Sequence, residues 1–326
     1  MAKLYYEDDA DLQVLSGQSV AVVGYGNQGR SWALNLRDSG LDVRVCVRAD
    51  ESRARAQEDG FEAEPIESAN RADVLCVLIP DDVIPLLPLA PRADALTIVA
   101  SGYTLAFDRF MPEGDVGMVA PRMLGPEVRR CFVEEAGFIT AVGVHRDVTG
   151  SATSRTLAIT KAIGGLREGA IELDARQEAI LDLAVEQVLS PALTHVNTAF
   201  VGSMLEQGIP LEAIMTELVL SGEVERTYGL LRKRGFVEQM EFHSPTSQYG
   251  QLSRRGSFDH LDVASKMRDL VDDIASGRFA DEWDRERDAG HPRLAALKDE
   301  HCSESVRDLE GDMRRRLGPG VRGRPS

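Results

Sequence analysis

A glycine-rich loop between a strand pattern and a helix pattern is the feature that most constrains this fold. Residues 20–40 read VAVVGYGNQGRSWALNLRDSG, in which an apolar run ends at Gly24 and helical spacing continues to Gly40. A continuous apolar run of this length is typical of a strand buried in a parallel sheet. The stretch therefore predicts a strand, a tight turn and a helix.

Each glycine of this loop has its own physical reason. Gly24 permits the tight turn, Gly26 lets the backbone approach a pyrophosphate, and Gly29 lets the helix pack on the strand. The N-terminus of the helix offers free N–H groups and a partial positive charge to the phosphates. The alternative is a glycine turn with only a structural role, but the next strand pattern, LDVRVCVR, begins about 20 residues later, as a dinucleotide-binding unit requires. The predicted cofactor loop comprises Gly24, Tyr25, Gly26, Asn27, Gln28 and Gly29.

More strand patterns follow, and they define the fold class. They are ADVLCVLIP at 72–80, LTIVAS at 96–101, VGMVAP at 116–121 and GFITAVGVH at 137–145. We predict an α/β protein with an N-terminal Rossmann-like, doubly wound sheet. Because ligands bind at the carboxyl ends of the strands in such sheets, the loops that start at Pro80, Ser101 and Pro121 should face the cofactor and the substrate.

The strand signal vanishes at about residue 175, and the remaining patterns are helical. The expected domains are a dinucleotide-binding domain at 1–174 and an all-α domain at 175–326. The Gly/Pro/Arg-rich tail, about 314–326, is expected to be disordered.

Composition excludes several classes of function. With 53 acidic and 37 basic residues the net charge is −16, which argues against nucleic-acid binding and favours a small-molecule partner. The chain has no apolar run of about 18 residues and no apolar leader, so neither membrane insertion nor secretion is expected. Four scattered cysteines without a CxxC pair fit reduced thiols in the cytoplasm.

Three carboxylates occur among apolar residues in the helical region. Asp182 and Glu186 are four residues apart in LDLAVEQVL, which places them on one face of a helix, and Glu217 has a similar apolar neighbourhood. Buried carboxylates need a cation, and Mg²⁺ prefers oxygen ligands. A metal site is one interpretation, whereas a polar helix face or pairing with arginine is the other.

Ordered motifs in both predicted domains resemble the ketol-acid reductoisomerases, in their short form. The motifs are VAVVGYGNQGRSWALNLRDSG, DVLCVLIPDDV, MVAPRMLGPEVRR, DLAVEQVL and SPTSQYG. The resemblance implies an enzyme that depends on NAD(P) and Mg²⁺, in which metals polarise a hydroxy-ketone for an alkyl shift before the nicotinamide delivers hydride. It also implies a knotted helical domain for metal and substrate, and a homodimer or higher homo-oligomer with shared active sites.

The resemblance assigns roles to individual residues. Asp182 and Glu186 match the family's metal ligands on one helix, Glu217 matches the metal-binding carboxylate of the other subunit, and Ser244 matches the serine that contacts the substrate. Arg122 and Ser101 occupy two further catalytic positions. The remaining positions expected at the cofactor are Arg48, Asp50, Glu51, Ser52, Pro80, Asp81, Ser101 and Gly102.

The chain departs from the family pattern at four places. The family histidine is Ser101, the family lysine is Arg122, and a carboxylate of the second metal position is Ala213. The fourth departure is the stretch 50–53, which reads Asp-Glu-Ser-Arg where the family places small hydroxyl residues for the 2′-phosphate of NADP. Asp50 and Glu51 favour binding of NAD over NADP, whereas the neighbouring Arg48 and Arg53 favour binding of NADP.

Ser101 and Arg122 replace the two family residues that handle protons. This change favours a diverged enzyme that is redirected to a hydroxy or keto acid of specialised metabolism, and cyclopropanol-type ring formation is one such reaction. The first alternative is an ordinary ketol-acid reductoisomerase that converts 2-acetolactate to 2,3-dihydroxyisovalerate in valine and isoleucine synthesis. The second is a non-catalytic NAD(P)-binding protein.

Overall fold

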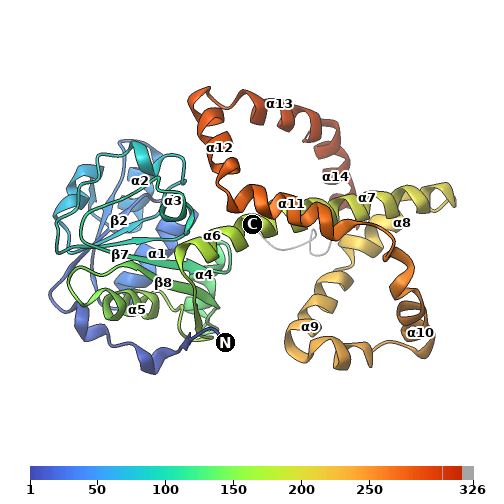
Figure 1. The fold of residues 1–326 in the computed structure, drawn as a ribbon, viewed down its shortest axis with the longest axis horizontal. Helices are drawn as coiled ribbons and strands as arrows, with labels where there is room; N and C mark the ends of the chain where they lie inside the picture. The colour runs from blue at the N-terminus through green and yellow to red at the C-terminus, as the bar shows by residue number, and fades with distance from the viewer. Residues whose placement is uncertain (303, 318–326) are drawn as a thin grey trace. The chain divides into compact units, whose positions relative to one another are not determined.

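The structure is a computed structural model that describes residues 1–302 and 304–317. The chain divides into two compact units, Met1–Leu183 and Ala184–Ser326. The first contains all strands of the described residues, and the second is helical (Figure 1).

The first unit is built on a nine-stranded mixed sheet with the order β1-β9-β8-β7-β6-β5-β2-β3-β4. The strands are β1 Leu4–Tyr5, β2 Ser19–Val23, β3 Asp42–Cys46, β4 Ala63–Glu64, β5 Val74–Val77, β6 Leu96–Val99, β7 Asp115–Pro121, β8 Thr140–Arg146 and β9 Ala170–Glu172. Strands β2 to β7 are parallel to their neighbours, whereas β8 is antiparallel to β7 and β1 is antiparallel to β9. The chain leaves β2 toward β3 and later returns on the other side with β5, so the strand order reverses at β2. Such a reversal is where doubly wound sheets bind ligands.

The two faces of this sheet are covered differently. The helices whose apolar residues join the larger core cluster are α1 Asn27–Asp38, α2 Glu51–Glu58, α4 Gly125–Val133 and α5 Ala152–Ala162. Trp32 of α1 and Ile159 of α5 are fully buried there. The segments that contribute to the clusters on the opposite face are short: η3 Ile66–Arg71, η4 Ile84–Leu86 and α3 Tyr103–Ala106.

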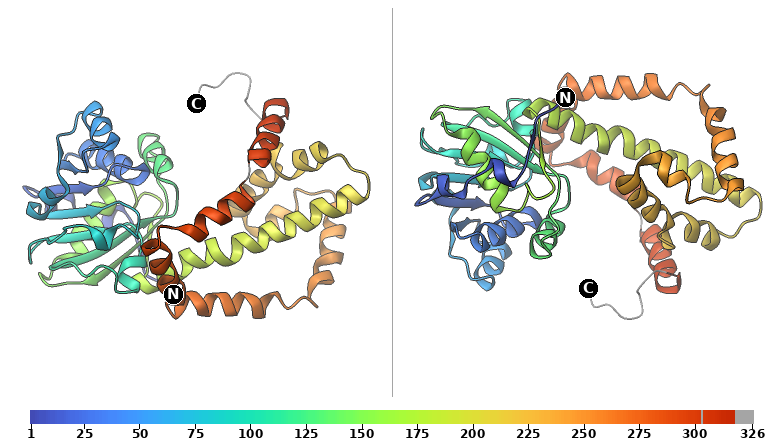
Figure 2. Two further views of the ribbon diagram at one scale, coloured as in Figure 1. Left: turned by 90° about the horizontal axis from the view of Figure 1, so that it is seen from above. Right: turned by 90° about the horizontal axis from the view of Figure 1, so that it is seen from below.

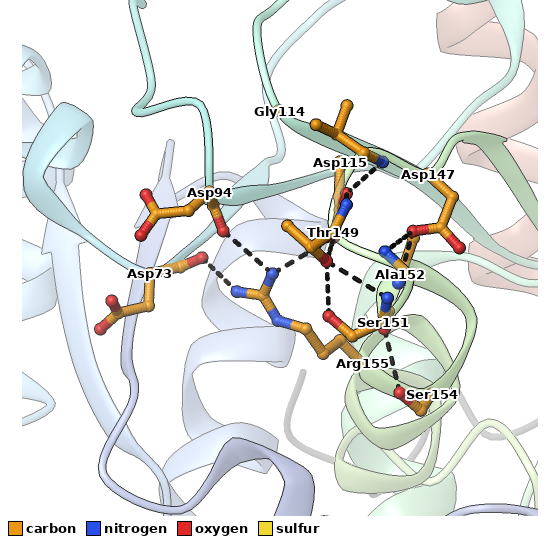
Figure 3. A network of polar contacts seen from close by, with 12 residues as sticks. Asp73, Asp94, Gly114, Asp115, Asp147, Thr149, Ser151, Ala152, Ser154 and Arg155 are labelled. Atoms are coloured by element: carbon orange, nitrogen blue, oxygen red, sulfur yellow. Dashed lines mark hydrogen bonds and ion pairs between the residues drawn. The ribbon is translucent and has the colours of Figure 1, made fainter.

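One buried arginine ties together the amino ends of the parallel strands (Figure 3). The Arg155 side chain is 7% exposed, and its Nη1 lies 3.5 Å from Oδ2 of the fully buried Asp115. Arg155 also donates to the main-chain carbonyls of Asp73 at 2.7 Å and Asp94 at 3.3 Å. The Thr149 hydroxyl donates to Asp115 at 2.6 Å. Because ligands bind at the opposite, carboxyl ends of the strands, we assign this network to stability.

The second unit consists of helices over its described residues. They are η5 Val185–Leu189, α7 Ser190–Glu206, α8 Leu211–Met215, η6 Thr216–Leu220, α9 Glu223–Met240, α10 Pro245–Arg254, η7 Arg255–Phe258, α11 Val263–Ala275, α12 Arg278–Asp288, α13 Pro292–His301 and α14 Glu304–Leu317. α6 Ala175–Ala184 leads into this unit. Both η5 and η6 are π-helical turns, a form that is rare and often occurs at functional sites.

This second unit buries few apolar side chains of its own. Those that it buries in the described residues are Val188, Ile214, Met240, Ile274, Ala280 and Met313. Large apolar side chains remain exposed along its helices, among them Val219 at 60%, Tyr228 at 62%, Phe242 at 65% and Tyr249 at 74%. Figure 2 shows successive helices laid out openly rather than as a closed bundle. An exposed apolar surface of this kind is typical of an interface with another chain.

The predicted fold class is confirmed, since a Rossmann-like sheet precedes a helical region. Each predicted strand is present, but β8 runs antiparallel to β7, so the sheet is mixed.

The expectation of a disordered tail is wrong for 314–317, which belong to α14, and 318–326 lie outside the described residues. The compact units meet at Leu183, and α6 therefore packs with the sheet unit. No helix within 1–302 and 304–317 combines the length and the apolarity needed to cross a membrane.

Candidate active site

Two neighbouring cavities lie at the carboxyl ends of β2, β3, β5 and β6. One, of about 210 Å³, is lined by the glycine loop and by residues that follow β3, including Arg48, Asp50 and Ser52. The other, of about 350 Å³, is lined by Gly26, Asn27 and Gln28 together with Pro80, Asp81 and Ser101. The two cavities share Gly26, Leu78, Ile79 and Pro80. Two joined cavities around one glycine loop suit the two halves of a dinucleotide.

The glycines of the loop fit the reasons that the sequence predicts. Gly24 has φ +96°, and a Cβ there would lie 2.6 Å from the Leu78 carbonyl oxygen. A Cβ on Gly29 would lie 2.2 Å from the carbonyl oxygen of Gly24, so the helix packs directly on the turn. Gly26, by contrast, has open space where its Cβ would stand and is the N-cap of α1. The space at Gly26 leaves its backbone accessible to a phosphate group.

Tyr25 contributes to this loop through its backbone. Its side chain is 2% exposed, and its hydroxyl donates to Asp59 at 2.8 Å. Burial, followed by the hydrogen bond to Asp59, raises the pKa of Tyr25 well above its ordinary range. Asp59 also receives two hydrogen bonds from Arg30, at 2.7 and 2.9 Å. The buried Tyr25 side chain thus fixes the loop to Asp59.

Asp50 is held at the cavity wall by its own helix. It is the N-cap of α2, where its Oδ1 accepts from the Ser52 N–H at 2.9 Å. Its Oδ2 lies 3.5 Å from Nε of Arg48, whose side chain is 77% exposed. The hydrogen bond from Ser52 lowers the pKa of Asp50, so the group is ionised at neutral pH. Glu51 is exposed at the start of α2.

Asp81 and Ser101 line the second cavity together. Burial raises the pKa of Asp81 to about 7, and the nearby charges of Glu178, Asp182 and Asp82 act in the same direction. Ser101 accepts a hydrogen bond from the Tyr103 N–H at 3.2 Å. The carboxyl of Asp81 therefore lies at the wall of the same cavity as Ser101, with its pKa displaced toward neutrality.

Arg122 bridges two carboxylates at the carboxyl end of β7. Its Nη2 lies 2.8 Å from Oε1 of Glu178, and its Nη1 lies 3.1 Å from Oδ1 of Asp182. Both carboxylates belong to α6, where a spacing of four residues places them on one face. Arginine pairing, one of the two readings that the sequence left open, is therefore present at Asp182. Asp182 is 45% exposed rather than buried, because apolar neighbours such as Leu181 and Val185 also face outward.

Glu178 is a site residue that the sequence analysis missed. Its side chain is 1% exposed, and its Oε2 accepts from the Gly102 N–H at 2.6 Å. A Cβ at Gly102 would lie 2.1 Å from the Ala175 carbonyl oxygen, so only glycine permits this approach of α6. A signal was available, because Glu178, Asp182 and Glu186 repeat at four-residue spacing.

Three of the predicted residues belong to the second unit. Glu186 lies in the π-helical turn η5, four residues after Asp182, and Glu217 lies in the π-helical turn η6. Ser244 is the N-cap of α10 and accepts from the Ser247 N–H at 3.3 Å. Within the part of the chain that the structure describes, no group of three or more acidic, histidine or cysteine side chains is arranged to hold a metal ion.

A Rossmann-like unit with a dinucleotide cleft and an acidic cluster at its edge defines an NAD(P)-dependent oxidoreductase. Residues 14–169 match the family described as "Acetohydroxy acid isomeroreductase, NADPH-binding domain", and residues 176–317 match "Ketol-acid reductoisomerase, C-terminal domain". The chain belongs to the ketol-acid reductoisomerase family, and the family resemblance of its motifs is confirmed.

Relatives correspond to the chain over nearly its whole length. The "Ketol-acid reductoisomerase (NADP(+))" of Caldivirga maquilingensis is 37% identical, covering 98% of this chain and 100% of the relative. The "Ketol-acid reductoisomerase (NAD(P)(+))" of Metallosphaera sedula is 34% identical, covering 100% of this chain and 98% of the relative. The solved structure of an "NADH-preferring ketol-acid reductoisomerase from an uncultured archean" superposes with a TM-score of 0.88 at 30% identity, covering 96% of this chain and 98% of that one.

Proposed function

We propose that this protein is a working ketol-acid reductoisomerase that converts 2-acetolactate to 2,3-dihydroxyisovalerate with a reduced nicotinamide and Mg²⁺. The observation that carries the proposal is the match to ketol-acid reductoisomerases through both units. The expectation of an enzyme redirected to specialised metabolism finds no support in these comparisons. The ordinary reaction, first weighed as the alternative, is favoured instead.

The reaction combines an alkyl shift with a reduction. The methyl group on C-2 of 2-acetolactate migrates to C-3, the C-2 hydroxyl loses its proton and becomes a carbonyl, and the C-3 carbonyl gains a proton. NAD(P)H then delivers hydride to C-2, whose oxygen takes up a proton, and leaves as NAD(P)⁺. Bound Mg²⁺ supplies Lewis-acid polarisation of the reacting oxygens.

The chain's own residues divide this work among them. Gly26 and the N-terminus of α1 receive the pyrophosphate, and the cavity at Pro80 and Ser101 receives the nicotinamide. Asp81, whose pKa burial raises to about 7, holds or releases a proton near neutrality. That property offsets the absence of a histidine at position 101, and it supports turnover despite the altered residues.

Asp182 and Glu186, with Glu217 of a second copy, are proposed to hold the metal. All three are oxygen donors, and Mg²⁺ is commonly held by one or two carboxylates while it keeps several waters. The half-exposed Asp182 is open to such an ion. Ala213 supplies no ligand, so we expect a weakened second metal position.

We further propose that the protein is a homodimer or a higher homo-oligomer. The support is the exposed apolar surface of the second unit, which includes Val219, Tyr228 and Phe242. A second copy is the partner that would also bring Glu217 to the metal. A knotted helical region and Ser244 as the substrate-contacting serine stay predictions.

The test is oxidation of reduced nicotinamide by the purified protein with 2-acetolactate and Mg²⁺. We expect turnover that stops with EDTA and that falls by about a hundredfold or more in Asp182→Asn. Asp42→Asn, an exposed change at the start of β3, is the matched control and should leave the rate unchanged. Dinucleotide binding with no Mg²⁺-dependent turnover would instead favour the non-catalytic binding protein.

A further inference from the structure

Arg122 makes two contacts of unequal strength with α6. Its partner Glu178 is buried, with one oxygen 2.8 Å from the guanidinium and the other held by the Gly102 N–H at 2.6 Å. Its partner Asp182 is 45% exposed and receives one contact, at 3.1 Å. Breaking a buried charge pair is costly, whereas half-exposed pairs contribute little. Burial therefore favours persistence of the ion pair with Glu178 when the contact with Asp182 is broken, even though only the Asp182 contact has hydrogen-bond geometry.

The atom that Arg122 contacts is Oδ1 of Asp182, one of the two carboxylate oxygens that a metal ion could use. A guanidinium keeps its positive charge at every physiological pH, so it occupies this oxygen whenever no stronger cation does. A divalent ion that binds Asp182 through Oδ1 has to displace Nη1, and an ion at either oxygen lies close to the positive charge that stays on Glu178. Both effects weaken its binding.

We infer that Arg122 is an internal cation that competes with the divalent metal for Asp182 and thereby sets the metal affinity of this enzyme. Arg122 acts here as a positioning residue, because its Nη1 holds the Asp182 side chain in place. The inference rests on the proposed metal-binding role of Asp182. It goes beyond that role, since it makes Arg122 an antagonist of the metal rather than a supporting group.

The test is Mn²⁺ binding to the full-length protein, followed by the electron paramagnetic resonance of free Mn²⁺, without substrate or nicotinamide. Arg122→Gln removes the competing charge and should bind Mn²⁺ about fivefold more tightly than wild type, the factor expected for loss of about 1 kcal/mol of competition. Arg122→Lys should keep its ammonium on Glu178 and release Asp182, with a gain of about threefold. Arg130→Gln, which removes an exposed arginine paired with Glu127 and Glu134, is the matched control and should leave the affinity unchanged.

The outcomes separate the inference from the function on which it rests. If folded Arg122→Gln binds Mn²⁺ as tightly as wild type or more weakly, the inference that Arg122 competes with the metal is overturned, even if wild type binds the metal. Should Arg122→Gln fail to fold because Glu178 loses its partner, Arg122→Lys decides in the same way. Binding that Asp182→Asn leaves intact places the metal elsewhere, and no binding by any variant removes the metal site itself.

Discussion

At the scale of single residues, we expect Asp50 to decide which dinucleotide the cleft prefers. It lies at the wall of the cavity that follows β3, and it is ionised there because of the hydrogen bond from Ser52. A fixed negative charge repels a 2′-phosphate, while its oxygens accept hydrogen bonds from ribose hydroxyls. We therefore expect NADH to bind more tightly than NADPH.

Asp50→Ser tests this preference without disturbing the helix, since serine is also a good N-cap for α2. We expect the dissociation constant for NADPH to fall by about tenfold, with little change for NADH. Titration of both dinucleotides by fluorescence measures the effect. Glu58→Gln, at the far end of α2, is the control. A wild-type protein that already binds NADPH more tightly would contradict the assignment.

Asp81 predicts a pH dependence of stability in the metal-free protein. Its pKa is raised to about 7 by burial and by the charges of Glu178 and Asp182, whereas an unfolded aspartate titrates near 3.8. Between these values the folded state binds more protons than the unfolded state, so this group's contribution to stability falls as pH rises and is fully lost above about pH 7.

Asp81→Asn removes the fall in stability that ionisation of Asp81 causes as the pH rises. The variant should gain stability over wild type progressively from about pH 4 to pH 7, by a total of the order of 4 kcal/mol, with a constant difference above that range. Calorimetric melting in EDTA across this range measures the difference. A difference that does not vary with pH would show that Asp81 is ionised throughout.

How far the sequence could predict the site differs among its residues. The glycine loop and Asp81 follow strands and belong to recognisable patterns, so their places could be inferred. The pairing of Arg122 with Glu178 could not, because it joins positions 56 residues apart through the packing of α6 on Gly102. Residue types alone left a metal and an arginine as equal partners for Asp182.

At the scale of elements, α5 stabilises the amino ends of the strands through Arg155 (Figure 3). Arg155→Met preserves much of the apolar stem but leaves the fully buried Asp115 without its cationic partner. We expect the free energy of unfolding to fall by about 2–4 kcal/mol. Urea unfolding measures the change, and Arg130→Met, which removes only exposed pairs, should leave the free energy of unfolding almost unchanged. Equal losses in the two variants would refute this role of the buried network.

The sequence predicts where the strands lie along the chain better than whether neighbouring strands are parallel or antiparallel. Apolar runs located β5, β6, β7 and β8, because buried strands need continuous apolar residues. They did not reveal that β8 runs antiparallel to β7, since both directions require the same burial. The π-helical turns at Glu186 and Glu217 also went unpredicted, because their residue pattern is that of an ordinary α-helix.

At the scale of the whole molecule, the two units differ in how their sequence encodes them. The sheet unit has its own core, so its fold class could be read from buried strands and a glycine loop. The helical unit leaves large apolar side chains such as Tyr249 and Phe242 exposed. Such exposure is what we expect of an interface with a second chain, which a single sequence does not display.

The central claim is that the chain catalyses a rearrangement and a reduction as one reaction. The most direct measurement is ¹³C NMR of the product formed from 2-acetolactate labelled in the methyl group on C-2, with Mg²⁺ and NADH. We predict that the label appears on C-3 of 2,3-dihydroxyisovalerate, because the methyl group migrates before hydride is delivered. A label that stays on C-2 of a reduced product, or a substrate that is left unconverted, would contradict the assignment of this chain as a working ketol-acid reductoisomerase.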